Sequence, residues 1–205
     1  SPIALTVRVP VVLVVHPSMP ITSVKELIAL AKAKPGELNY ASGVSGSSNH
    51  IAMELFKSMT AINVARIPYS GTGPALNAVI AGEVKVIFPG AGAAIAHIKS
   101  GRLRALAVAS AQPSTLLPGM PTVAASGVPG FTYESRQGIW APAKSAAAVI
   151  KRLNQDMARV LKMPEVMEQF RNAATETVGS SPEEFAAAIK AEMASIGKVI
   201  KDVGI

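Results

Sequence analysis

A loop of small residues, Ser42 to Ser47, is the segment of this chain whose residue types best suit the binding of a ligand. It follows a short apolar run, Leu38 to Ala41, which predicts a β-strand. It precedes apolar residues at helical spacing, Ile51, Leu55 and Met59, which predict one face of a helix. The first turn of a helix has unpaired N–H groups and the positive end of the helix dipole, so this arrangement favours the binding of an anion.

The glycines of this loop do not have the spacing of two known phosphate-binding motifs. No Gly-Lys-Ser/Thr closes the loop as in a Walker motif, and Gly43 and Gly46 lack the G-x-G-x-x-G spacing of dinucleotide sites. An ordinary strand-to-helix turn is the alternative interpretation, because Ser and Gly are common at helix caps. Our candidate ligand-binding residues in the loop are Ser42, Ser45, Gly46 and Ser47.

The chain has three histidines, His16, His50 and His97. His50 lies in the first turn of the helix after the loop, where its ring can donate to a bound carboxylate; a plain helical histidine is the alternative. The patterns around His16 and His97 favour structural roles. No two histidines have metal-binding spacing and no carboxylate cluster accompanies them, so we expect no metal ligands.

The loop also lacks the pattern of a serine hydrolase. Gly43-Val44-Ser45-Gly46 is shifted from the Gly-x-Ser-x-Gly elbow, and no acidic residue near the loop completes a triad. The absence of an acid/base pair favours a binding protein rather than an enzyme, and no cofactor is implied.

The strand–loop–helix pattern occurs twice more. One copy runs from Val64 through the loop Tyr69 to Gly73, where Tyr69, Gly71 and Thr72 are candidate ligand contacts. The other places a third loop directly after Phe88, also a candidate. Short crossovers of this kind predict a parallel sheet, so the three loops should lie at one edge of it.

The composition bounds the remaining possibilities. The chain has 205 residues, 49% hydrophobic and 4% aromatic, enough for one large or two small domains. The net charge is +7, but Lys and Arg are scattered singly without interleaved aromatics, so we expect small anions rather than nucleic acid as partners. No apolar run reaches the length of a membrane span, no signal peptide is recognised, and the lack of Cys excludes disulfides.

The two ends of the chain have different patterns. Val11 to Val15 is apolar without alternation, which predicts a strand buried on both faces. From Ser145 the chain is mainly helical, with a capping box at Ser181 and Glu184 before the last helix.

Five segments, in order along the chain, carry recognisable motifs: VLVVHPSMP (12–20), LNYAS (38–42), IPYSG (67–71), HIKSGRLRALAV (97–108) and LPGMPTV (117–123). Together they resemble the solute-binding receptors of tripartite tricarboxylate transporters, also called Bug proteins. The resemblance implies a periplasmic α/β receptor of the type II periplasmic-binding-protein-like architecture. Its two lobes would close on a small carboxylate, an organic acid or an amino acid, and deliver it to the membrane subunits of the transporter.

The resemblance also implies a division of the chain. Residues 1–16 would be interlobe strands, 17–110 the second α/β lobe, 111–122 an interlobe linker, and 123–205 the mainly helical C-terminal part of the first lobe. The three candidate loops would be the second lobe's share of the cleft.

Two features depart from the family pattern. Relatives carry a further segment ahead of this start, with a Gly-rich loop of the first lobe, so we expect a truncated receptor whose second lobe is complete and whose first lobe is only partly present. The residue after Phe88 is often Asp in relatives and is Pro89 here. A truncated receptor would bind ligand weakly, or self-associate as a homo-oligomer through an uncovered apolar tail.

The sequence thus favours a carboxylate-binding receptor and leaves two alternatives open. One is a Ser-dependent hydrolase that uses the same loop, and the other is an interaction module that binds no ligand. Neutral donors fit many acids, so the sequence does not select the ligand.

Overall fold

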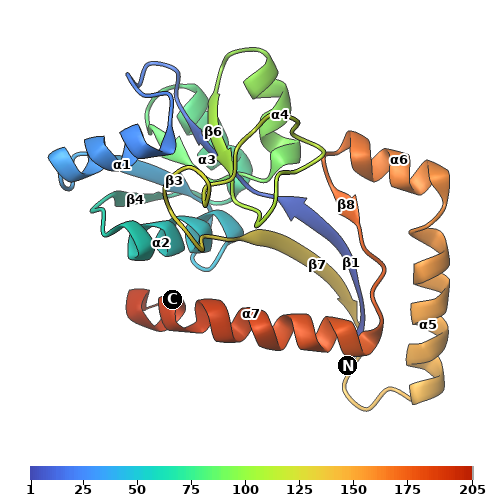
Figure 1. The fold of residues 1–205 in the computed structure, drawn as a ribbon. Helices are drawn as coiled ribbons and strands as arrows, with labels where there is room; N and C mark the ends of the chain where they lie inside the picture. The colour runs from blue at the N-terminus through green and yellow to red at the C-terminus, as the bar shows by residue number, and fades with distance from the viewer. Residues whose placement is uncertain (205) are drawn as a thin grey trace. The chain divides into compact units, whose positions relative to one another are not determined.

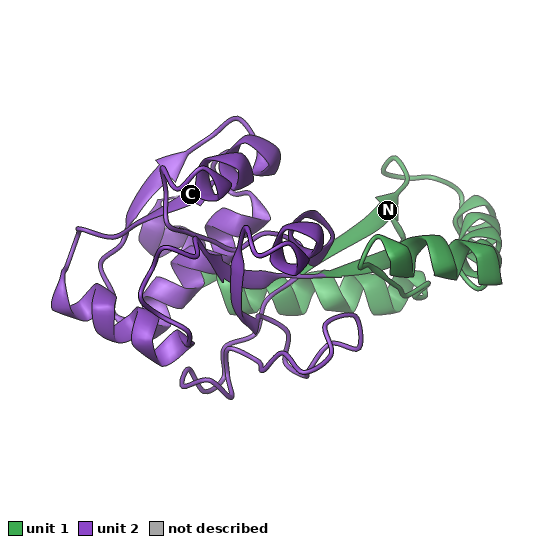
Figure 2. Cartoon of the chain, turned by 90° about the horizontal axis from the view of Figure 1, so that it is seen from above, with its two compact units in different colours: residues 1–9, 135–198 green, residues 10–134, 199–205 purple. Residues whose placement is uncertain are grey.

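The computed structural model describes residues 1–204, which divide into two compact units (Figure 2). The first unit comprises residues 1–9 and 135–198, and the second comprises residues 10–134 and the segment from Val199 onward. The predicted domain boundaries at residues 16, 110 and 122 stay a prediction. Each unit is described by itself.

The second unit contains a five-stranded sheet with the order β4-β3-β5-β2-β6. Figure 1 labels β3, β4 and β6 of this sheet. Its strands are β2 (Val12–Val15), β3 (Asn39–Ser42), β4 (Ala65–Pro68), β5 (Val86–Ile87) and β6 (Arg104–Val108). β3 is parallel to β4 and β5, whereas β2 is antiparallel to β5 and β6. The prediction of parallel strands is therefore confirmed for β3, β4 and β5. The sheet as a whole is mixed because β2 is not joined to its neighbours by a short helical crossover.

Four helices belong to this sheet: α1 (Val24–Ala33), α2 (Ser48–Thr60), α3 (Thr72–Ile80) and α4 (Ala91–Lys99). The apolar faces of α1 and α2 join one core cluster with Tyr40 and Phe88. α3 packs against β3 and β5 with a different set of buried residues. Because the crossovers through α2 and α3 lead to opposite sides of β3, right-handed connections put these helices on opposite faces of the sheet.

Strand β2 is buried on both faces, as its unbroken apolar sequence predicted. Leu13 and Val15 belong to the core cluster under α1 and α2, whereas Val12 and Val14 are fully buried outside that cluster. Three phenylalanines, Phe56, Phe88 and Phe131, anchor the cluster with ring centroids 5.8 to 5.9 Å apart.

The first unit contains a three-stranded sheet with the order β7-β1-β8. The elements that lie wholly or mostly in this unit are β1 (Pro2–Pro10), β7 (Glu134–Trp140), α5 (Ala147–Val160), α6 (Pro164–Asn172), β8 (Glu176–Thr177) and α7 (Pro182–Val203). The predicted capping box before α7 is confirmed: the Ser181 N–H donates to Oε2 of Glu184 at 2.9 Å, and the Glu184 N–H donates to the Ser181 hydroxyl at 3.1 Å. Across residues 1–204, none of the helices has the length and hydropathy needed to cross a bilayer.

Candidate functional site

The tips of three parallel strands in the second unit lie at one edge of its sheet. Ser42, the last residue of β3, is the register partner of Pro68 at the end of β4. Tyr40 of β3 pairs with Val86, so β5 ends at the same level. The three predicted loops therefore leave the sheet at the same edge, and the predicted arrangement of the strands is confirmed.

The first two loops are joined by direct contacts. The Tyr69 N–H donates to the Ser42 carbonyl at 2.8 Å. The backbones also approach closely at Gly43, where an added Cβ would lie 3.3 Å from the carbonyl carbon of Gly71. Only glycine fits this contact without displacing the second loop.

Asn49 connects the two loops through its side chain. Its Oδ1 accepts from the Gly43 N–H at 3.0 Å and from the Ser47 hydroxyl at 2.6 Å, and its Nδ2 donates to the Thr72 hydroxyl at 3.2 Å. Asn49 is only 1% exposed, so these bonds replace those that water would make. Our sequence reasoning missed Asn49, because a polar residue in a first helical turn has no distinctive pattern.

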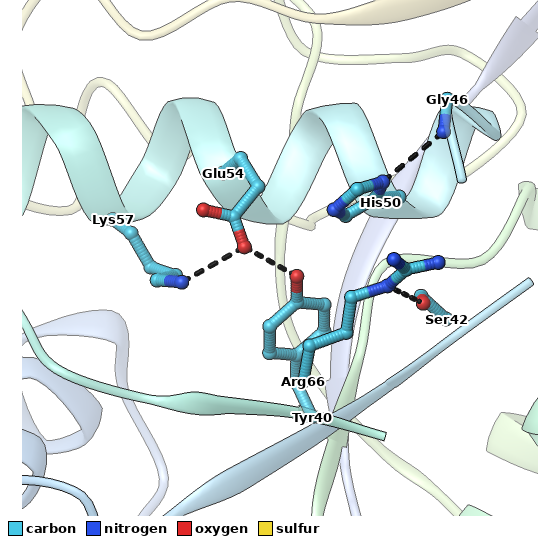
Figure 3. Close-up of polar contacts among 7 residues, drawn as sticks. All are labelled: Tyr40, Ser42, Gly46, His50, Glu54, Lys57 and Arg66. Atoms are coloured by element: carbon cyan, nitrogen blue, oxygen red, sulfur yellow. Dashed lines mark hydrogen bonds and ion pairs between the residues drawn. The ribbon is translucent and has the colours of Figure 1, made fainter. Parts of the chain in front are cut away.

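Arg66 of β4 reaches the same loop from the neighbouring strand (Figure 3). Its Nε donates to the Ser42 hydroxyl at 2.6 Å and its Nη2 donates to the Gly43 carbonyl at 2.9 Å. The residue is partly exposed, and within residues 1–204 it forms no ion pair. Sequence reasoning missed this cation as well, because it treated Lys and Arg as scattered.

His50 supports the tip of the loop from the first turns of α2. Its Nδ1 accepts from the Gly46 N–H at 3.1 Å, so the neutral ring carries its proton on Nε2 (Figure 3). Burial lowers the pKa of His50, the charges of Arg66 and Lys57 lower it further, and Glu54 opposes them. The ring therefore stays neutral at neutral pH and keeps its acceptor for Gly46.

A second polar cluster lies beside His50 under α2. Glu54 accepts from the Tyr40 hydroxyl and from Lys57 Nζ, the latter at 2.8 Å (Figure 3). Burial, followed by the bond to Glu54, raises the pKa of Tyr40, so the phenol remains a proton donor. Lys57 neutralises the charge of Glu54, which leaves the charge of Arg66 uncompensated among the described residues.

The predicted site residues differ in accessibility. Ser45 and Gly46 are exposed, and Ser47, Tyr69, Gly71 and Thr72 are partly exposed. Ser42 and His50 are buried and bond to the loop and Arg66 rather than to solvent. The choice of Phe88 needs correction: its side chain, directly after β5, points into the core and is fully buried against Phe56 and Phe131.

No group of His, Cys, Asp and Glu within residues 1–204 has the arrangement of a metal site. An open groove of about 540 Å³ lies between Leu103 to Leu106 and the segment Pro118 to Pro121. Because β6 runs parallel to β3, its start at Arg104 puts this groove at the end of the sheet opposite the three loops.

The sequence matches a known protein family. Residues 1–205 match the family described as the tripartite tricarboxylate transporter family receptor. The chain belongs to this receptor family. The resemblance inferred from the sequence is thus confirmed, and the members of the family are solute-binding receptors rather than enzymes.

Curated relatives agree with this assignment. The chain is 34% identical to Protein BugT of Bordetella pertussis over 99% of its own length and 62% of that protein. It is 32% identical to a protein of Pseudomonas sp. strain P51, over 97% of its own length and 60% of that protein. The chain therefore spans about 60% of the length of these curated receptors.

Solved structures confirm the periplasmic-binding-protein-like α/β fold. An R. palustris protein determined with adipate is 34% identical, with a TM-score of 0.91, and the match covers 100% of this chain and 69% of that one. The periplasmic binding protein BugD is 27% identical, with a TM-score of 0.88 and the same coverage.

Proposed function

We propose that the chain captures a small carboxylate at the edge formed by its three strand-tip loops, for uptake by a tripartite transporter. The observation that carries the proposal is the joining of two of these loops into one surface by Asn49, with the uncompensated guanidinium of Arg66 against it. A surface of N–H groups and one fixed cation suits an anion.

The strength of such a site comes from a few bonds. Hydrogen bonds to a charged group contribute roughly 1.5–3 kcal/mol each, so two or three donors suffice for selective binding. Gly46 and Ser45 are the exposed part of the first loop, and the Ser45 hydroxyl has no hydrogen-bond partner among the described residues. We assign Ser45 as a donor to the bound carboxylate.

A related receptor of known structure suggests the first ligand to test. The R. palustris receptor that is 34% identical to this chain was determined with adipate. A similar organic acid is our proposed ligand, and amino acids form the second class to test.

A hydrolase that uses the same loop is less well supported. The Ser47 hydroxyl donates to Asn49, and Nδ1 of His50 is occupied by the Gly46 N–H. Neither bond activates a nucleophile, because activation needs a base that accepts the hydroxyl proton. We therefore propose that the chain has no catalytic activity, in agreement with its membership of a receptor family.

The wider setting is also a proposal. We place the receptor in the periplasm, with the membrane subunits of the transporter as its partners, on the basis of the family. Self-association through the tail stays a prediction, motivated by exposed side chains such as Trp140, Val149 and Met193. Light scattering at micromolar concentration checks it, and a monomer would contradict it.

Calorimetric titration with adipate tests the function. The Ser45→Ala variant should bind adipate about three- to tenfold more weakly, the effect of one lost hydrogen bond. Ser58→Ala is the matched control, because Ser58 is exposed on α2 away from the loop and should leave the affinity unchanged. If no organic acid or amino acid binds the unmodified chain, the proposed function is wrong. Hydrolysis of an ester that is lost in Ser45→Ala would favour the hydrolase instead.

A further inference from the structure

Arg66 is a cation that the surrounding residues hold in place without neutralising it. The buried carboxylate of the same cluster, Glu54, is paired with Lys57 at 2.8 Å, and Arg66 forms no ion pair within the described residues. The bonds that Arg66 makes go to a hydroxyl and a carbonyl, which carry no net charge. A partly buried positive charge of this kind is stabilised by an anion from solution.

The orientation of the guanidinium is fixed by the loop that it supports. The bonds from Nε and Nη2 to Ser42 and Gly43 fix the plane of the group. A guanidinium has five N–H donors, so three of them have no partner among the described residues. Such a group binds a carboxylate with two parallel hydrogen bonds and little loss of side-chain entropy.

We propose that Arg66 pairs with one carboxylate of the bound acid and makes this receptor selective for dicarboxylates. The inference rests on the proposed function and specifies its ligand class. The exposed tip of the first loop, with the Ser45 hydroxyl, binds one carboxylate, and Arg66 binds the other. A monocarboxylate of the same chain length fills only one of these positions.

The test compares two ligands that differ at one end only. Adipate and hexanoate have the same six-carbon chain, but hexanoate replaces one carboxylate with a methyl group. We expect the unmodified chain to prefer adipate by about tenfold or more, the range of a charge-assisted hydrogen-bonded pair. In Arg66→Gln this preference should fall to about twofold or less, and Arg66→Lys should restore part of it.

The ratio of the two affinities separates selectivity from support of the loop. If Arg66 only holds Ser42 and Gly43, Arg66→Gln weakens adipate and hexanoate by the same factor and the preference survives, which would overturn the inference. Arg102→Gln is the matched control, since Arg102 is exposed, donates from Nε to the Ser100 hydroxyl and carries the same charge. The control should keep the full preference for adipate. Failure of both acids to bind the unmodified chain would refute the proposed function itself.

Discussion

The side-chain amide of Asn49 donates a hydrogen bond to the Thr72 hydroxyl at 3.2 Å, between residues 23 positions apart in the sequence. Asn49 is the second residue of α2 and Thr72 is the first of α3, so this bond joins the starts of two helices that follow neighbouring strands. Four hydrogen-bonding groups meet at Asn49: its own amide, Gly43, Ser47 and Thr72. The geometry of the two loops therefore depends on one buried side chain.

Replacing Asn49 with Ala should destabilise the second unit and weaken adipate binding. The buried Gly43 N–H loses its acceptor, and an unsatisfied buried donor costs about 1–3 kcal/mol. Urea unfolding measures the change in stability, and calorimetric titration measures the affinity. Asn77→Ala is the control, because Asn77 is exposed on α3. Equal effects of the two substitutions would contradict the role of Asn49.

The stability of the chain should fall with acidification because of His50. The pKa of His50 is lowered in the folded state. At a pH below the ordinary pKa of 6.5, His50 is therefore protonated to a greater extent in the unfolded chain than in the folded chain. The contribution of the neutral ring is complete above pH 6.5 and is lost as the pH falls from there through the folded-state pKa.

Urea unfolding between pH 8 and pH 5 checks this expectation for His50. The loss of stability should be smaller in His50→Gln, which does not titrate and keeps an oxygen to accept from Gly46. An identical pH dependence in His50→Gln would exclude His50 as its source.

Removing Lys57 should cost more than removing a lysine from a surface ion pair. Lys57→Met leaves the carboxylate of Glu54, which is 6% exposed, without its cation, so we expect a loss of about 1–3 kcal/mol. Lys34→Met removes a pair whose side chains are 57% and 66% exposed, and it should cost less than about 1 kcal/mol.

The double variant Glu54→Gln, Lys57→Met isolates the unpaired charge. It should be more stable than Lys57→Met alone, because it contains no buried carboxylate without a cation. Thermal unfolding followed by circular dichroism ranks the variants. If the single and double variants have the same melting temperature, the ion pair contributes no measurable stability.

Gly138 should tolerate no side chain, because it lies directly against a ring of the first unit. A Cβ at this position would lie 2.1 to 2.8 Å from ring atoms of Phe185, which also contacts Trp140 with ring centroids 4.8 Å apart. Gly138→Ala must displace the ring, at a cost of about 1–3 kcal/mol by the usual effect of overpacking. Gly197→Ala, in α7 with no atom within 4 Å, should instead stabilise the helix by about 0.5–1 kcal/mol. Urea unfolding should give opposite signs for the two variants; the same sign would contradict the contact.

Much of the fold could be predicted because it depends on local patterns. The unbroken apolar run of β2, the capping box at Ser181 and the three strand–loop–helix units each involve residues that are near neighbours in sequence. Hydrophobic periodicity and capping act over one or two turns or one strand, so the sequence displays them directly. The family could also be identified, because its motifs are continuous segments.

The sequence by itself therefore determined the α/β class, the positions of the loops and the receptor family. Only the tertiary structure decided which side chains meet at the loops. The register between β3 and β4 brings Arg66 to Ser42, and the approach of two loops brings Asn49 to Thr72. The direction of the side chain at the end of β5 puts Phe88 into the core. Strand register and side-chain direction follow from packing between segments distant in the sequence, so no local pattern reports them.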